Sequence, residues 1–133
     1  QVIQADDGFL LVVSYNPGYQ NAVKDLKHST RQRFVAIEFD FPDVDRETKI
    51  IAHESGLEEG MSNQLAVLGQ KIRNLREHGL EEGASTRLLI YAARLIKQGI
   101  SPKRACQVAL TWGITDEVQI QETVDQIVSS IFE

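Results

Sequence analysis

Residues 9–18 read FLLVVSYNPG, an apolar run that leads through Ser14, Tyr15 and Asn16 into a Pro-Gly turn. A strand without polar alternation is typically buried on both faces, as in a parallel sheet covered by helices. Asn16 is then predicted to lie just beyond the carboxyl end of a central strand, the edge at which open α/β sheets bind ligands. The alternative is that Asn16 only opens a turn, because Asn-Pro is also a common turn signal.

Two strands and five helices are predicted along the chain. The strands cover Val2 to Val13 and Phe34 to Phe41, and the second alternates apolar with polar residues. After Pro42 the apolar period changes from 2 to about 3.6, which indicates helices. The helices are expected at roughly Asp45 to Glu54, from Ser62 to Gly79, from Ser85 to Gly99, from Pro102 after a cap at Ser101, and after a cap at Thr115.

The chain is therefore expected to contain a strand-rich piece, residues 1–42, and a helical domain, residues 43–133. Two strands cannot form a stable sheet alone, and a buried parallel strand needs neighbours that these residues do not contain. The sequence thus predicts an α/β protein with mostly helical content, in which the end of an α/β domain precedes a complete small helical domain. We interpret the chain as a piece of a larger protein.

Composition narrows the class of protein. The hydrophobic content of 42% and the charged content of 25% are ordinary for a globular domain. No apolar run approaches the roughly 20 residues that span a bilayer and no signal peptide is recognisable, so we expect no membrane insertion and a cytoplasmic location. Cys106 has no partner in the chain and is interpreted as a small core residue, with a catalytic thiol as the alternative. The three histidines show no metal-ligand spacing, so no metal site is predicted.

Charge is distributed unevenly in a chain of net charge −5. Residues 105–133 contain only acidic charges, whereas the other 104 residues hold 14 acidic and 14 basic side chains. Against that neutral background the segment from Gln20 to Arg33 is basic. Its single acidic residue is Asp25, and its four basic residues are Lys24, Lys27, Arg31 and Arg33. A local basic cluster in an acidic protein favours a discrete anion such as phosphate. The acidic total and the lack of a basic recognition helix count against a nucleic-acid-binding module.

Arg87 is unusual for its position. It falls in the first turn of the helix that Ser85 is expected to cap, where the helix dipole disfavours a cation by a few tenths to about 1 kcal/mol. An anion bound there would be favoured by both the arginine and the free backbone N–H groups. Arg87 also shares a polar stripe with Tyr91, Arg94 and Gln98, so an ordinary solvated helix face is the alternative interpretation.

Five strings carry a family resemblance: SYNPGYQ at 14–20, LKHSTRQRF at 26–34, FDFP at 39–42, IAHESG at 51–56 and HGLEEGASTRLL at 78–89. They closely resemble the CbbQ/NorQ/NirQ family of the MoxR clade of AAA+ ATPases, over essentially the whole chain. The resemblance implies that residues 1–42 form the C-terminal end of an AAA+ α/β nucleotide-binding domain. It also implies that residues 43–133 form the helical lid domain.

The resemblance also implies roles for four residues. Asn16 takes the position of sensor 1, which orients the attacking water. Arg31 and Arg33 lie in the arginine-finger segment, which projects into the nucleotide site of a neighbouring subunit. The family pattern favours Arg33 as the arginine finger, and Arg31 is the alternative. Arg87 matches sensor 2, the lid arginine that contacts the same phosphates from within its own subunit.

Two other motifs of such ATPases do not occur in these 133 residues. There is no G-x-x-x-x-G-K-[ST] loop to hold phosphates, and no apolar strand ending in Asp-Glu to hold magnesium. The resemblance places both motifs upstream of Gln1, so ATP and Mg²⁺ are expected to bind mainly to that preceding part of the protein. The chain alone is expected not to hydrolyse ATP.

The resemblance further implies assembly and partners. The intact protein is expected to form a homo-oligomer, a hexameric ring, and to act with a partner that bears a von Willebrand factor A domain. Its client would be Rubisco or nitric oxide reductase and related denitrification enzymes. The alternative is a non-catalytic assembly or interaction module that completes another subunit's site.

Overall fold

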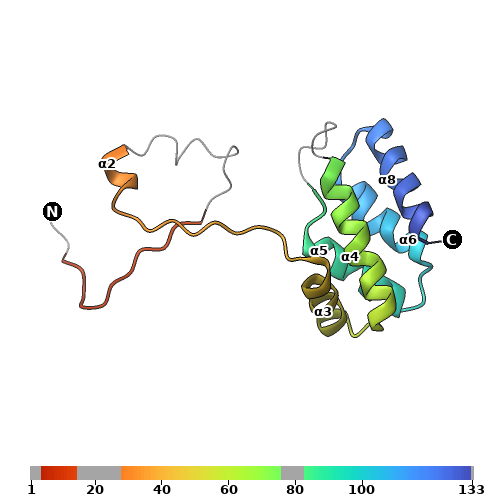
Figure 1. Ribbon diagram of the computed structural model, residues 1–133, viewed down its shortest axis with the longest axis horizontal. Helices are drawn as coiled ribbons and strands as arrows, with labels where there is room; N and C mark the ends of the chain where they lie inside the picture. Colours follow the sequence, from red (N-terminus) through yellow and green to blue (C-terminus); the bar gives the residue numbers. More distant parts are fainter. Residues whose placement is uncertain (1–3, 15–27, 76–82, 133) are drawn as a thin grey trace. The chain divides into compact units, whose positions relative to one another are not determined.

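The computed structural model describes residues 4–14, 28–75 and 83–132. The chain divides into two units, Gln1–Phe39 and Asp40–Glu133, which are considered separately below (Figure 1). Asn16 and Gly79, two residues with predicted roles, lie outside the described residues.

The first unit contains one short helix in its described part, α2 (His28–Arg31). The two predicted strands are not formed, because residues 4–13 and 34–41 run without strand pairing. Their apolar side chains stay exposed to solvent: 79% for Leu10, 77% for Val12 and 93% for Val35. The difference from the sequence prediction has a simple cause, since a strand requires a partner for its backbone N–H and C=O groups, and within residues 4–14, 28–75 and 83–132 no segment pairs with these two.

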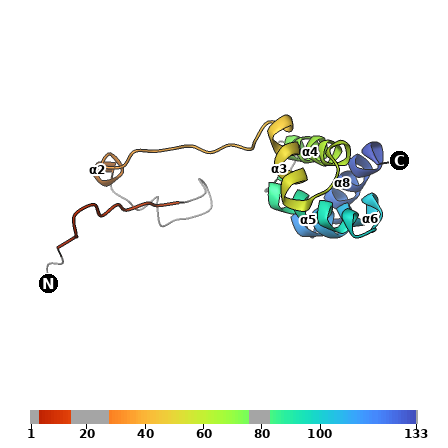
Figure 2. The ribbon, with the colours of Figure 1, turned by 90° about the horizontal axis from the view of Figure 1, so that it is seen from below.

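The second unit is a bundle of helices, as predicted for the C-terminal part of the chain. Its elements are α3 (Val44–Ser55), α4 (Glu59–Arg73), α5 (Thr86–Lys97), α6 (Pro102–Cys106), η2 (Gln107–Thr111), α7 (Trp112–Ile114) and α8 (Val118–Ile131). The central helix is α4, which packs against α3, α5 and α8 (Figures 1 and 2). In turn, α5 packs against α3, α6 and η2.

The core lies where the apolar faces of these helices meet. The predicted apolar period of about 3.6 residues is confirmed in α4, α5 and α8, because Leu65, Leu89 and Val124 are fully buried within one cluster. The Cys106 side chain belongs to the same cluster, and its burial raises the thiol pKa from 9.0 to about 12. This confirms the interpretation of Cys106 as a core residue.

The helix ends of this unit carry local capping signals, and those at Ser85 and Pro102 were predicted. Asp43 caps α3 by accepting a bond from the Arg46 N–H at 2.8 Å, and Gly56 ends α3 in the left-handed conformation at φ 66°. Ser85 caps α5, and Pro102 is the first residue of α6.

Two predicted helix starts, after Ser62 and after a Thr115 cap, are wrong. Helix α4 begins at Glu59 with Glu58 as its cap, so Ser62 lies inside the helix, where its hydroxyl donates to the Glu58 carbonyl oxygen. A serine can bond to the carbonyl four residues earlier as readily as it caps, and here a glutamate carboxylate supplies the cap. At α8 the cap position is Glu117, and Thr115 instead accepts a bond from the Glu117 N–H.

The predicted fourth helix consists of three consecutive pieces, α6, η2 and α7. The middle piece is a π-helix, which widens the turn by one residue. As a result both Leu110 and Thr111 are fully buried, and the Thr111 hydroxyl donates to Asp125 of α8 at 2.6 Å. Of the described helices, not one combines the length and the apolar character that crossing a membrane demands.

Candidate functional site

The residues with predicted roles fall into two groups. Arg31 is the last residue of α2 and Arg33 follows two positions later, so both lie in one exposed segment of the first unit. Arg87 belongs to the second unit. The predicted sensor Asn16 lies outside the described residues.

Arg87 is the second residue of α5 and is exposed. Ser85 forms the cap, accepting a bond from the Leu88 N–H with its side-chain oxygen at 3.4 Å. No carboxylate in the described part of the chain forms an ion pair with Arg87. The first backbone N–H groups of a helix have no acceptor within it, so this end of α5 offers hydrogen-bond donors beside a guanidinium.

A buried ion pair lies next to this end of α5. The side chains of Glu47 in α3 and Arg73 in α4 are 1% and 9% exposed. Two parallel bonds join them, from Nη1 of Arg73 to Oε2 of Glu47 at 2.8 Å and from Nη2 to Oε1 at 2.7 Å. This fork-to-fork geometry fixes both the distance and the relative orientation of the two side chains.

The ion pair is bonded directly to the residues that open α5. The Thr86 hydroxyl donates to Oε1 of Glu47 at 2.7 Å, and Nε of Arg73 donates to the Ala84 carbonyl oxygen at 2.8 Å. We call Glu47, Arg73 and Thr86 the polar cluster. Together its bonds hold the chain on both sides of the Ser85 cap, immediately before Arg87.

Two further contacts surround Arg73. The guanidinium lies over the Phe41 ring at 3.9 Å from the ring centroid, within the range of a cation–π interaction. Gly83 packs against the stem of Arg73 so closely that a Cβ atom at this glycine would lie 2.9 Å from Cγ of Arg73. The chain entering the helical domain at Phe41 and the chain entering α5 at Gly83 therefore both contact the same side chain.

The polar cluster was not foreseen from the sequence. Its signal was present, because Glu47 occupies a place on the apolar face of α3 four residues before the fully buried Ile51. A charged residue at such a place indicates a buried partner. Sequence alone does not say which of the many arginines supplies it.

The rest of the polar stripe on α5 is exposed, as expected of a solvated face. Arg94 donates to the Glu54 carbonyl oxygen at 3.2 Å, and its guanidinium lies 4.0 Å from the Glu54 carboxylate. Tyr91, Arg94 and Gln98 line a shallow, mainly apolar groove between α5 and η2. Arg87 does not line it, so the solvated-face interpretation describes the outer part of the stripe.

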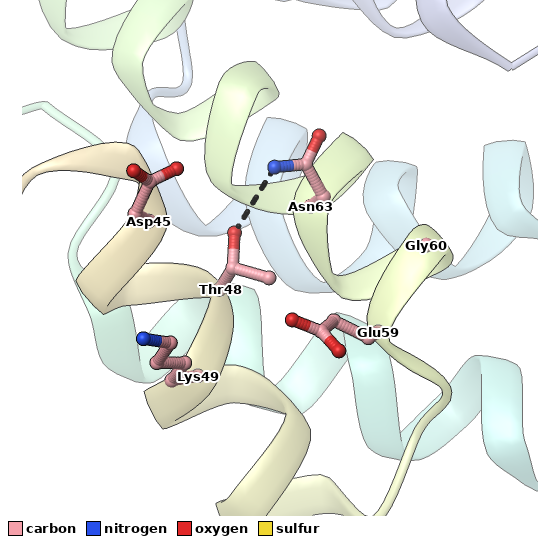
Figure 3. A pocket seen from close by; sticks show the side chains of 6 residues that line it. All are labelled: Asp45, Thr48, Lys49, Glu59, Gly60 and Asn63. Atoms are coloured by element: carbon pink, nitrogen blue, oxygen red, sulfur yellow. Dashed lines mark hydrogen bonds between the residues drawn. The ribbon is translucent and has the colours of Figure 1, made fainter.

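A second shallow groove of about 400 Å³ lies between α3 and α4 (Figure 3). Its walls carry Asp45 and Lys49 from α3 and Glu59 and Asn63 from α4, and Asn63 donates to the Thr48 hydroxyl at 3.3 Å. Two carboxylates face this groove with a single cation, so it disfavours a phosphate group. The end of α5 is the better place for an anion.

The described residues contain one place that suits a phosphate group. Arg87 and the N-terminus of α5 suit a phosphate group in charge and in donor geometry. The described ranges offer no comparable site for Mg²⁺, because they contain no group of three His, Cys, Asp or Glu residues placed to hold a metal. Arg87 is therefore the candidate residue for contact with a phosphate group.

The architecture is that of the helical lid that follows the nucleotide-binding core in AAA+ proteins. A family model described as CbbQ/NirQ/NorQ C-terminal matches residues 47–131, more than half of the chain. The chain belongs to the CbbQ/NorQ/NirQ family. The matched segment begins at Glu47 and includes the whole polar cluster and Arg87.

Curated relatives agree with this assignment. The denitrification regulatory protein NirQ of Pseudomonas aeruginosa is 55% identical over 117 residues, which cover 88% of this chain and 45% of NirQ. NorQ of Paracoccus denitrificans is 49% identical over 98% of this chain and 48% of NorQ. Protein CbbQ of Hydrogenophilus thermoluteolus is 46% identical over 99% of this chain and 49% of CbbQ. The chain spans about half the length of these relatives.

Proposed function

We propose that this chain is the C-terminal part of an AAA+ ATPase and that Arg87 contacts the phosphates of ATP bound to the same subunit. What supports the proposal is the exposed guanidinium of Arg87 in the first turn of α5. A helix N-terminus already favours an anion, and an arginine there strengthens the attraction through its planar fork of donors. A bound phosphate removes the unfavourable interaction between Arg87 and the helix dipole.

Arg31 and Arg33 act from the other unit in this proposal. Both are exposed, Arg31 at the end of α2 and Arg33 two positions later, as a side chain that reaches into a neighbouring subunit must be. A guanidinium placed there stabilises the charge that develops on the transferred phosphoryl group. Asn16 would orient the attacking water, and Mg²⁺ and most of the ATP would be held by a preceding part of the protein.

Membership of the family supports a proposal for the wider role. We place the intact protein in a ring of identical subunits, a hexamer, working with a partner that bears a von Willebrand factor A domain. ATP hydrolysis would be coupled to activation of a client enzyme, either Rubisco or nitric oxide reductase and related denitrification enzymes. The NirQ relatives are described as denitrification regulatory proteins, which supports the second client.

The test compares the ATP affinities of two variants of the whole protein, each lacking an exposed arginine in the first turn of a helix. Arg87→Ala should weaken ATP binding about 10- to 100-fold, the loss expected when one charged hydrogen-bonding group is removed. Arg46→Ala is the matched control, because Arg46 is also exposed in the first turn of a helix of this domain. Equal ATP affinities in titration calorimetry of the two variants would rule out the proposed role of Arg87.

The alternative of a non-catalytic module is decided by the size of the native product. Intact mass and N-terminal sequencing of the protein from its source cell should give a product about twice this length with a phosphate-binding loop upstream. A native product of 14.9 kDa that begins at Gln1 would instead favour a module that completes or regulates another subunit's site.

A further inference from the structure

The polar cluster joins α3, α4 and α5 through hydrogen bonds between side chains. A buried ion pair contributes little net stability compared with apolar side chains of similar volume, because both charges must be taken out of water. The directions of its bonds are more informative than its energy. Every described hydrogen bond that the Arg73 side chain donates or the Glu47 carboxylate accepts stays within the cluster or ends on Ala84.

These bonds fix the backbone that carries Arg87. Thr86 immediately precedes Arg87, and its hydroxyl is bonded to Glu47, whereas Ala84 is held through its carbonyl oxygen by Arg73. Two anchors on residues 84 and 86 leave the first turn of α5 little freedom to rotate or to shift along its axis. The position of the Arg87 Cα atom is therefore set by side chains from α3 and α4.

The Arg87 side chain itself lies outside the polar cluster. It is exposed, and in the described part of the chain neither Glu47 nor any other carboxylate pairs with it. Its guanidinium is thus available to a ligand while its backbone is held. This is the arrangement expected of a residue that must meet a phosphate at a fixed place, since precise placement of a charged group requires a rigid support.

We propose that Glu47, Arg73 and Thr86 are positioning residues for Arg87, and that they set its affinity for the phosphates of ATP without contacting the nucleotide. This inference rests on the proposed function, because it assigns the polar cluster a role in the same site. Thr86 is its most specific member, since its hydroxyl makes one bond to the ion pair and its removal leaves both charges paired.

The test is made in the whole protein with two matched substitutions. Thr86→Val keeps the shape of the side chain and removes its 2.7 Å bond to Glu47. Thr111→Val is the control, because the Thr111 hydroxyl makes the same kind of bond, 2.6 Å to Asp125, elsewhere in the same domain. Both variants lose one threonine–carboxylate bond, so both should lower the melting temperature of the domain by a similar amount.

The two variants should differ in nucleotide affinity. Thr86→Val is expected to weaken ATP binding about three- to tenfold, and Thr111→Val to leave it within about twofold. Thr86→Ser, which keeps the hydroxyl, should restore most of the affinity. If Thr86→Val binds ATP as tightly as Thr111→Val does, the positioning role is wrong.

A double substitution separates the failure of this inference from failure of the proposed function. In an Arg87→Ala background, Thr86→Val should have no further effect on ATP affinity, because it acts only through Arg87. An additive loss would show that Thr86 acts independently of Arg87 and would overturn the inference. Should Arg87→Ala alone leave ATP affinity unchanged, the proposed function fails, whatever Thr86→Val does.

Discussion

Removing the Glu47 carboxylate is expected to be among the most damaging single changes in the helical domain. The Glu47→Ala substitution would leave the Arg73 guanidinium buried, with its side chain 9% exposed and without its counter-charge. It would also leave the Thr86 hydroxyl without its acceptor. Breaking one side of a buried ion pair typically costs about 3–5 kcal/mol, which is a large part of the stability of a small domain.

Urea unfolding followed by far-ultraviolet circular dichroism measures this loss in a helical domain. With a slope of about 1–2 kcal/mol per M, the expected loss of about 3–5 kcal/mol lowers the unfolding midpoint by roughly 1.5–5 M. The control is Glu54→Ala, because the carboxylate of Glu54 lies 4.0 Å from Arg94 in a pair whose side chains are about half exposed. Solvent screening limits that pair to about 1 kcal/mol or less.

A second comparison tests the cause of the loss. Replacing both partners, as in Glu47→Leu with Arg73→Met, removes both buried charges and should recover most of the stability. The reasoning would be refuted if Glu47→Ala costs no more than Glu54→Ala. It would also be refuted if the double substitution is as unstable as Glu47→Ala alone, because the unpaired charge would then not be the source of the loss.

Three further predictions concern other parts of the chain. In the ring that we propose for the whole protein, Arg33→Ala should lower the rate of ATP hydrolysis about 10³-fold, the scale of an arginine finger. Nucleotide affinity measured by calorimetry should stay nearly unchanged. A parallel loss of affinity would place Arg33 in its own subunit's site. The Cys106 thiol, whose pKa is raised to about 12, stays protonated at pH 8, so a thiol reagent should label it only after unfolding. Because its pKa in the unfolded chain is lower, near 9, the stability that this thiol contributes is complete below pH 9 and falls as the pH rises toward 12. Gly69→Ala should lower the free energy of unfolding, measured by denaturation, by about 1–3 kcal/mol, because the added Cβ would lie 2.6 Å from Cδ1 of Leu89. The same substitution should be nearly neutral in a Leu89→Ala background. An equal loss in both backgrounds would contradict this packing.

The helices of the second unit could be predicted because their signals are local. An apolar period of 3.6 residues, a Ser85 cap and a Pro102 start each act within one or two turns of the chain. Ser62 shows the limit of such signals, because the same side chain can cap a helix or bond within it. The π-helical segment also escaped prediction, since its wide turn is supported by a contact between Thr111 and a residue of another helix, Asp125.

In the candidate site, too, some residues could be predicted from the sequence and others could not. Arg87 could be singled out, because a cation in the first turn of a capped helix conflicts with the helix dipole. The polar cluster beside it could not, since Glu47, Arg73 and Thr86 are 26 and 13 positions apart along the chain and meet only when three helices pack. The predicted strands failed for a related reason, because strand formation depends on neighbours that a periodic pattern does not supply.

The exposed apolar side chains of the first unit have a practical consequence for handling this chain. The FLLVV run at residues 9–13 carries no charge and no proline, and each of its side chains is at least 49% exposed. Such a segment pairs readily with its copy in another molecule, which is the first step of cross-β aggregation. Concentrated samples should therefore scatter light and bind thioflavin T through residues 9–13, while the helical domain in the same molecules stays folded. A charge introduced at Leu10 or Val12, outside the helical domain, would be the simplest way to keep such samples clear.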